Sequence, residues 1–460
     1  MNAAKALSDI WSLMHLPAEA LAHAKLPGRE PVLPSSFAVD VAAQASIAAA
    51  ALAACELGFE RGQPRRDVTV EPLHAAAECM AFYSIDGRVP PMWDAMSGNF
   101  RCKDGWVRVH ANFPQHRDGA LLLLGLDPAT ATRDDLASAA STWECRKLEQ
   151  LAAEQGLLIA AARRFDEWDA HPAGQSIARQ PLMTLERIGD AAPRRHSTLQ
   201  PGQLPLQGIR VIDATRILAG PSCGRALATY GADVMLVNSP GLPNIEMIAT
   251  TSRGKLSAHA DLRTEAGRTA MRGLSESCDV FLQSYRPGAM ESLGFGPSEL
   301  AKNHPGIVYA SLSAYGEQGE WGQRKGFDSL VQTTMGFALE EAQAAGSSEP
   351  KALPVQIFDW ATGFLMAFGS AAALVHQCRE GGSWHLRVSL AQTAHWLRSL
   401  GRVEGGLAIP QPKQDASLLE ETTSGFGKLI AVKHSARMAN TKEVPLRPSM
   451  PPGSHPPVWP

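Results

Sequence analysis

The sequence predicts an α/β fold with a Rossmann-like parallel-sheet large domain and a small α+β domain. The parallel sheet is indicated by a strand-helix-strand pattern over residues 208–237. Two more apolar strand-like segments, residues 279–283 and 306–312, each follow a helical stretch. Strands that alternate with helices in this way are typical of parallel sheets. The Asp104-Gly105 turn between two alternating segments predicts a hairpin in the small domain.

The composition is that of an ordinary globular protein. The chain has 460 residues, with 45% hydrophobic residues, 19% charged residues and a formal net charge of -3. This balance gives no reason to expect nucleic acid or a membrane surface as a partner. The 7 cysteines are dispersed without a Cys-x-x-Cys pair, which favours reduced thiols, and no ligand spacing predicts a metal site.

Residues 1–15 lack the basic start and continuous apolar core of a signal peptide. The Ala-rich residues 41–57 come nearest to a membrane span, but their composition predicts a packed helix. We therefore expect a cytoplasmic location.

Composition and punctuation divide the chain into six parts. Residues 1–36 form an N-terminal lead-in, and residues 37–92 predict a helix and a strand followed by another helix. Residues 93–192 predict the small α+β domain, 193–207 a linker, and 208–400 the Rossmann-like domain. Residues 401–460 form a Pro-rich C-terminal arm, with a glycine turn and a strand near residues 421–432. The sequence suggests no function for this arm.

Two parts of the chain share one pattern. The helix beginning at Asp40 stops near Gly62, and the helix beginning at Asp359 stops near Gly381, with equal separations (62 − 40 = 381 − 359 = 22). A short strand and the start of another helix follow in both parts. The repeat is weak by identity but consistent in pattern, and it predicts two related segments. We interpret Asp40 as a helix cap and a remnant counterpart of Asp359.

Asp359 precedes about five helical turns of small and apolar residues. At a helix start, the free backbone N–H groups and the helix dipole would keep a carboxylate ionised. Asp359 is therefore either a plain helix cap or a carboxylate nucleophile in an apolar site. The residue alone does not separate these two interpretations.

An ordered series of motifs between Leu206 and Gly363 resembles the class III CoA-transferases, the CaiB/BaiF family. The motifs are Leu206-Gln-Gly-Ile-Arg-Val-Ile-Asp-Ala-Thr-Arg, Leu218-Ala-Gly-Pro, Gly231-Ala-Asp-Val, Arg253-Gly-Lys, Asp261-Leu, Tyr285-Arg-Pro-Gly, Leu293-Gly, Tyr315-Gly, Gly326-Phe-Asp, and Asp359 with Thr362-Gly363. The domain order resembles a rearranged or fused version of the family's, because the small domain here precedes the Rossmann-like domain.

The resemblance implies an enzyme that moves CoA between an acyl-CoA and a carboxylic acid. Asp359 would be the nucleophile and would carry an aspartyl-CoA thioester. The resemblance also implies a homodimer, no permanently bound cofactor, and a CoA thioester as substrate. The implied CoA-binding residues are Leu218, Ala219, Thr251, Ser252, Arg253, Gly254, Lys255, Ser284, Tyr285, Arg286, Lys325, Gly326, Phe327 and Asp328.

Two alternatives stay open at this point. Acyl-CoA racemases of this superfamily resemble the chain but carry a histidine where Phe327 stands. A racemase needs two titratable groups, which disfavours an acyl-CoA isomerase or racemase here. The other alternative is a non-catalytic relative that binds CoA.

Overall fold

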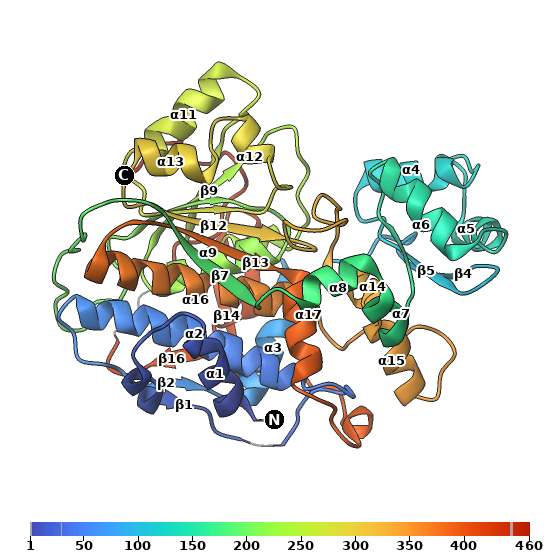
Figure 1. Cartoon of the computed structure of the whole chain (residues 1–460), viewed down its shortest axis with the longest axis horizontal. Coiled ribbons are helices and arrows are strands. Elements are labelled where there is room, and N and C mark those ends of the chain that lie inside the picture. The colour runs from blue at the N-terminus through green and yellow to red at the C-terminus, as the bar shows by residue number, and fades with distance from the viewer. Residues whose placement is uncertain (1, 29, 442–444) are drawn as a thin grey trace.

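Figure 1 shows the computed structural model, which describes residues 2–28, 30–441 and 445–460. Its centre is a seven-stranded sheet with the order β10-β9-β8-β11-β12-β13-β7. Neighbouring strands are parallel, except that β7 runs antiparallel to β13 at one edge. The strands are β7 (Met183–Gly189), β8 (Arg210–Ala214), β9 (Asp233–Asn238), β10 (Lys255–His259), β11 (Val280–Gln283), β12 (Val308–Ser313) and β13 (Ser383–Ser389).

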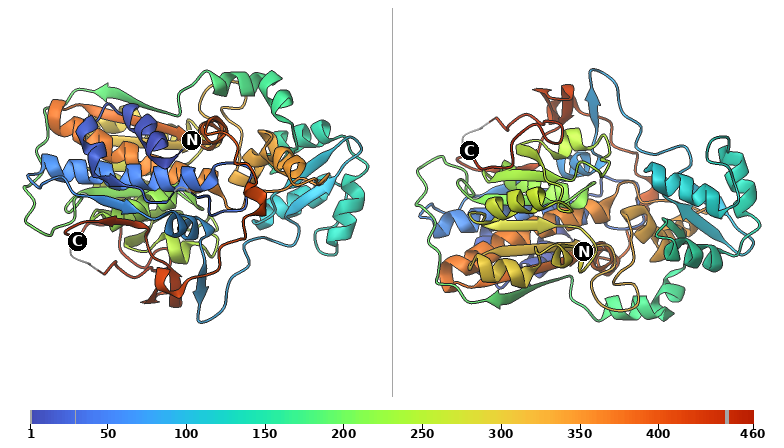
Figure 2. Two further views of the ribbon diagram at one scale, coloured as in Figure 1. Left: turned by 90° about the horizontal axis from the view of Figure 1, so that it is seen from below. Right: turned by 90° about the horizontal axis from the view of Figure 1, so that it is seen from above.

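Helices cover both faces of this sheet (Figure 2) because its strands are apolar on both sides. In β11, Val280 and Leu282 join the core formed with α9 and α16, whereas Phe281 joins the core formed with α11. The predicted α/β class and the mostly parallel sheet are therefore confirmed. The helices of this part are α9 (Ala219–Thr229), α10 (Ile248–Thr251), α11 (Glu265–Ser275), α12 (Ala289–Ser292), α13 (Pro297–Asn303), α14 (Asp328–Thr334), α15 (Phe337–Ala344), α16 (Ile357–Glu380) and α17 (Leu390–Ser399).

A smaller unit, residues 98–161, has its own apolar core and lies to the right in Figure 1. We call it the β4–β6 unit. The hairpin predicted around Asp104-Gly105 is present, with Arg101 opposite Trp106. The unit contains β4 (Gly98–Arg101), β5 (Trp106–Val109), β6 (Ile159–Ala161), α4 (Pro114–Leu123), α5 (Arg133–Ala140) and α6 (Cys145–Glu154), and it is followed by α7 (Phe165–Ala170) and α8 (Pro172–Ala178).

Strand β7 departs from the predicted domain boundaries. It lies in the range 93–192 that the sequence assigned to the small domain, but it pairs with β13 in the large sheet. Leu185 of β7 lies opposite Leu386, and Met183 lies opposite Val388. The position of an edge strand depends on the strand with which it pairs. A local sequence pattern does not identify that partner.

The predicted repeat has a counterpart in three dimensions. The N-terminal segment β1-α2-β2-α3 corresponds to β12-α16-β13-α17, although α14 and α15 come between β12 and α16 in the second segment. In both, the first two strands are parallel and a strand from elsewhere in the chain adds in antiparallel: β16 on β2, and β7 on β13. The elements are α1 (Ala3–Ser12), η1 (Ala18–His23), β1 (Ala24–Lys25), α2 (Val39–Glu60), β2 (Val68–Val70), α3 (Pro72–Met80) and β16 (Ala436–Met438).

Helices α2 and α16 pack side by side in the same direction (Figure 1). Near their starts, the Phe37 and Phe358 rings both contact Phe337. Near their ends, Arg379 of α16 pairs with Glu56 and Glu60 of α2. By length and hydropathy alone either helix would be long enough to cross a membrane, but 94% and 100% of their most apolar windows is buried inside the protein. They are the core helices of the fold.

The C-terminal arm folds back onto its own chain. Strands β14 (Leu419–Ser424) and β15 (Gly427–Val432) form a hairpin that continues on to β3 (Tyr83–Ile85). The tail then lies along the outer edge of β10, where Ser257 and His455 exchange two hydrogen bonds. The tail thereby covers an edge that would otherwise present unpaired backbone groups. The arm also contains the short helices η2 (Gly406–Ala408) and η3 (Ala416–Leu418).

A buried ion-pair network ties these parts together. Glu78 of α3 accepts hydrogen bonds from Arg225 of α9 and from Ser435 just before β16, and it pairs with His434. Burial opposes its ionisation, but His434 and Arg225 hold the pKa of Glu78 well below its ordinary value. Three segments that are distant in sequence therefore meet at one carboxylate.

We expect Arg225→Met to lower the free energy of unfolding by about 3 kcal/mol, because it leaves the buried Glu78 charge short of a partner. Denaturant unfolding measures this loss. Lys5→Met, which removes the exposed Lys5–Asp9 pair, is the control and should change little. Equal effects of the two substitutions would contradict the assigned role of the network.

Candidate active site

Asp359 is the third residue of α16 and is buried, with 8% of its surface exposed. Its helix is held close to the first loop of the large sheet. A Cβ at Gly363 would lie only 2.4 Å from the backbone oxygen of Ala219, so glycine permits this close approach of α16 to α9. The Thr362 hydroxyl hydrogen-bonds that of Thr393 on α17 at 2.6 Å. Asp359 therefore stands on a rigid, buried scaffold.

The start of α16 is capped by a different carboxylate. Asp328 Oδ2 accepts hydrogen bonds from the backbone N–H groups of Phe358 and Asp359, at 2.7 and 3.0 Å. Its other oxygen accepts from Gln332. The sequence predicted that these helix N–H groups would keep Asp359 itself ionised, but they serve Asp328. Among the described residues, no group donates to or accepts from the Asp359 carboxyl.

The two carboxyl groups are both buried. Burial raises the pKa of Asp328 to about 7. Burial also raises the pKa of Asp359 well above its ordinary value, and the nearby Asp328 carboxyl raises it further. A buried carboxyl that lacks hydrogen-bond donors binds its proton tightly. Once ionised, the same group is a poorly solvated and hence reactive nucleophile.

Asp359 lines a cavity of about 560 Å³ between the large sheet and the β4–β6 unit, which we call the Asp359 cavity. Segments distributed along the chain from Cys79 to Gln411 form its walls. The lining residues that bear on the chemistry are Trp93, Asn99, Arg108, His110, Asn112, Phe113, Arg133, Ile217, Leu218, Phe327, Trp360 and Asp359.

Aromatic rings form much of the wall near Asp359. Phe327 stacks on His110 with ring centroids 4.4 Å apart, and Trp93 meets His110 edge-on. Burial lowers the pKa of His110 to about 3, with a further effect from Arg108 and His116. His110 is therefore neutral at physiological pH. This wall suits an apolar chain passing toward Asp359.

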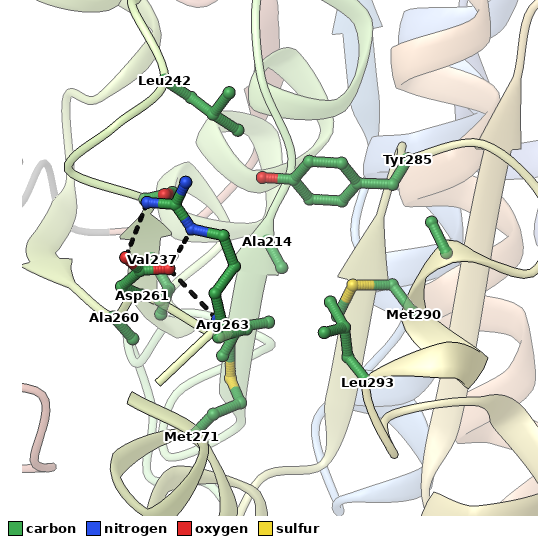
Figure 3. A pocket seen from close by; sticks show the side chains of 13 residues that line it. Ala214, Val237, Leu242, Ala260, Asp261, Arg263, Met271, Tyr285, Met290 and Leu293 are labelled. Carbon is green, nitrogen blue, oxygen red and sulfur yellow. Dashed lines mark hydrogen bonds and ion pairs between the residues drawn. The ribbon is translucent and has the colours of Figure 1, made fainter. Parts of the chain in front are cut away.

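A second cavity of about 160 Å³ lies at the carboxyl ends of β8, β9 and β11 (Figure 3), and we call it the strand-end cavity. The strand order reverses between β8 and β11, and open parallel sheets bind ligands outside the strands at this position. The Tyr285 ring, Leu242 and Met290 give it apolar walls, and the Asp261–Arg263 ion pair lies opposite the tyrosine. A flat aromatic group with polar edges fits these surroundings.

The loop after β8 lies between the two cavities. Ile217 lines the Asp359 cavity and has φ of 77°, which is strained for a β-branched residue and is typical of functional sites. Beneath the loop, Lys255 donates to Asp213 at 2.6 Å and to the backbone oxygen of Pro221 at 2.7 Å. This fully buried pair fixes the loop from below.

A group of cationic side chains lies near the same loop. Burial lowers the pKa of His116 to about 4, and the charges of Lys325 and Arg216 act in the same direction. Burial and the charge of Arg286 likewise lower the pKa of Lys325. The Arg216 Nε is buried without a hydrogen-bond partner among the described residues. Clustered cations that lack nearby acids are typical of anion sites.

The sequence-predicted binding residues are distributed unevenly around these cavities. Leu218 and Phe327 line the Asp359 cavity, and Tyr285 lines the strand-end cavity. Ser284 accepts a hydrogen bond from the backbone N–H of Arg216. Ala219 begins α9, Gly326 lies against Tyr315, and Arg286 and Lys325 belong to the cationic group.

Residues 251–255 are engaged elsewhere. Thr251 lines a small pocket with Arg216, and the Ser252 hydroxyl donates to the backbone oxygen of Ile248. Arg253 reaches the β14–β15 hairpin, where it donates to Glu420 and to the backbone oxygen of Val432. The Gly254 N–H donates to the backbone oxygen of Arg447. With Lys255 paired to Asp213, most of this segment supports the fold around the loop, and its role in ligand binding stays a prediction.

Comparison with known proteins identifies the family. The model of CoA-transferase family III matches residues 14–199 and 206–415. This chain belongs to CoA-transferase family III.

Individual relatives match part of the chain. A probable fatty acyl-CoA transferase of Mycobacterium tuberculosis, Rv3272, is 35% identical over 239 residues, 48% of this chain and 60% of the relative. An acyl-CoA transferase of Gibberella moniliformis is 32% identical over 302 residues, 62% of this chain and 53% of the relative. A crystal structure of Rv3272 aligns with 36% identity and a TM-score of 0.40, over 44% of this chain and 57% of that one. The chain thus spans about half to three fifths of these relatives.

Sequence reasoning did not select Arg216 and Ile217 as site residues. Arg216 ends the motif that runs from Leu206, so a signal for it was present in the sequence. The positive φ of Ile217 had no signal, because isoleucine rarely adopts that conformation.

We expect Arg216→Met to weaken CoA binding about tenfold, or ~1.4 kcal/mol, because a half-buried guanidinium would lose its hydrogen bonds to phosphate. Isothermal titration calorimetry at two salt concentrations measures this change. Arg268→Met, on the exposed face of α11 where Arg268 pairs with Glu265, is the matched control. Unchanged CoA affinity in Arg216→Met would exclude the cationic group as the phosphate site.

Proposed function

We propose that this protein transfers CoA between an acyl-CoA and a carboxylic acid through covalent intermediates on Asp359. The main support is the buried Asp359 carboxyl, which faces a cavity and has no hydrogen-bond partner among the described residues. Family membership and the names of the two relatives, both acyl-CoA transferases, agree with this chemistry.

The reaction needs only one ionised carboxylate. Asp359 attacks the thioester carbonyl carbon, the C–S bond breaks, and a mixed anhydride and the CoA thiolate form. The thiolate then attacks the Asp359 carbonyl, which releases the acyl group as its carboxylate and leaves an aspartyl-CoA thioester. An acceptor carboxylate reverses both steps and receives CoA, which regenerates the Asp359 carboxylate. No proton is gained or lost overall, and exclusion of water from the cavity by the bound substrates would protect the anhydride from hydrolysis.

The two cavities and the cationic group together suggest how CoA binds. The adenine base would occupy the strand-end cavity beside Tyr285, in the Rossmann-like position at the sheet's carboxyl edge. The phosphates would meet Arg216, Arg286 and Lys325. The pantetheine arm would then pass Ile217 and bring the thioester to Asp359. The remaining predicted contacts, the homodimer and the cytoplasmic location stay predictions.

Acyl-CoA isomerisation is a second candidate with one observation in its favour. Phe327 cannot move a proton, but His110 from the β4–β6 unit stacks directly on it. The cavity therefore holds a titratable group besides Asp359. The low pKa of His110 makes it a weak base, so we rank this activity second. Its signature would be deuterium entering the acyl α-carbon in D2O.

We expect incubation with acyl-CoA to place a CoA thioester on Asp359, detected by intact mass and removed by hydroxylamine. Asp359→Asn should lose the adduct, because an amide is not a nucleophile, while still binding CoA in calorimetry. Asp40→Asn is the matched control in the repeated segment: the Asp40 carboxylate accepts an N–H from Val32 at 2.9 Å, and the variant should keep the adduct. If wild-type protein forms no adduct but incorporates deuterium, the isomerase function replaces this proposal.

We expect the rate of adduct formation to rise with pH, because only ionised Asp359 attacks and its pKa is raised. Asp328→Asn removes the neighbouring negative charge and keeps an oxygen for the α16 N–H groups. The pKa of Asp359 should therefore fall, and the rising limb of the pH profile should move to lower pH. Single-turnover rates across pH measure this shift. A rising limb that stays in place or moves to higher pH would show that the two carboxyls are not coupled in this way.

A further inference from the structure

Arg108 of β5 lines the Asp359 cavity with a guanidinium that has no partner. Among the described residues, no hydrogen bond or ion pair reaches it, and its Nε is buried. The Trp93 ring supports it, with the guanidinium carbon 4.6 Å from the ring centroid. A buried polar group without a partner is costly and rare in folded proteins. The ring holds this cation in a defined orientation toward the cavity.

The other polar groups on the same wall are satisfied within the protein. Asn112 accepts from Ser97 at 2.8 Å and donates to the backbone oxygen of Met92 at 2.9 Å. Asn99 donates to the backbone oxygen of Pro350, and Arg133 donates to two backbone oxygens. Compared with these neighbouring side chains of the β4–β6 unit, Arg108 is the one whose side chain lacks a hydrogen-bond partner among the described residues.

The electrostatics at Arg108 call for an anion. Burial, together with a smaller effect of the positive charge of Arg133, lowers the pKa of Arg108 to about 10, so the guanidinium is still protonated at neutral pH. Glu349 lines the same cavity but forms no ion pair with Arg108. Two guanidinium groups, those of Arg108 and Arg133, thus lie near each other, and neither forms an ion pair with an acid among the described residues. A carboxylate bound there would gain charge-assisted, bidentate hydrogen bonds.

The position of Arg108 relative to Asp359 follows from the strand. Arg108 lies in β5 and His110 directly follows it; both contact Trp93 and line the cavity, and two residues of extended chain separate their backbones by about 7 Å. His110 stacks on Phe327, and the next residue, Asp328, caps the helix start that carries Asp359. Arg108 therefore lies two residues from His110, on the side of the aromatic wall away from Asp359. A ligand reaching both ends has a carboxyl carbon at Asp359, an apolar middle, and an anion at Arg108.

We infer that Arg108 binds the second carboxylate of a dicarboxylic substrate, whose first carboxyl group exchanges CoA at Asp359. This inference rests on the proposed function and narrows its substrates to dicarboxylic acids and their CoA monothioesters. Arg216 of the cationic group is separate from Arg108, because it lines a different pocket beside the loop after β8. The acyl chain lies against the aromatic wall, and Arg108 selects acids with a distal charge.

The test compares chain-matched acids as CoA acceptors: glutarate against pentanoate, and succinate against butanoate. We expect wild-type protein to favour the dicarboxylate in kcat/KM. Arg108→Met should lower kcat/KM for the dicarboxylate about a hundredfold and leave the monocarboxylate unchanged or improved. Arg101→Met is the matched control, because Arg101 of β4 also lies over a tryptophan ring, that of Trp106, but is exposed outside the cavity.

The outcomes separate this inference from the proposed function. If wild-type protein transfers CoA to both acids equally, or Arg108→Met slows both equally, the dicarboxylate site is excluded while the transferase function stands. If wild-type protein forms no aspartyl adduct, the transferase function fails. In that case calorimetry tests the carboxylate site at Arg108 independently of the reaction. Glutarate binding to the wild-type protein that is lost in Arg108→Met supports the site, and no glutarate binding to the wild-type protein excludes it.

Discussion

The buried start of α16 is the constraint on which this structure depends. A helix that begins in the protein core leaves N–H groups that water cannot reach, and some acceptor must satisfy them. Asp328 supplies that acceptor. Its negative charge then lies beside Asp359, whose own carboxyl is left with no hydrogen bond among the described residues. The need to satisfy the N–H groups at this helix start thus stabilises the scaffold. It also leaves the Asp359 carboxyl difficult to ionise and reactive once it is ionised.

Local patterns in the sequence predicted a large part of the fold. The strand-helix-strand pattern, the Asp104-Gly105 hairpin and the repeated helix-strand-helix segment each carry their signal within a short window, and all three are present. The edge position of β7 was not predictable in the same way, because it depends on a partner strand about 200 residues later. Sequence reasoning assigned β7 to the wrong domain because its partner strand is distant in the sequence.

The candidate site shows the same division. Asp359 was predictable because the start of an apolar helix and the surrounding motifs both point to it. Lys255 resembled a phosphate ligand, since lysine after Arg253-Gly254 is charged and follows a loop, but the fold places it opposite Asp213 with no exposure. The cap on α16 and the unpartnered state of Arg108 depend on contacts between separate parts of the chain. Residue type therefore indicated candidate chemistry, while the local electrostatic environment required the fold.

The two antiparallel edge strands have a consequence for how the chain acquires its structure. The early strand β2 is completed by β16 near the C-terminus, and the late strand β13 is completed by β7 from the first half. Each half therefore contributes a strand to the sheet of the other half, and both pairings span a long stretch of sequence. During synthesis on the ribosome, the N-terminal sheet must wait with an open edge until nearly the whole chain has emerged. Such long-range pairings slow folding and expose aggregation-prone edges, so this protein is expected to fold as one late, cooperative event rather than half by half.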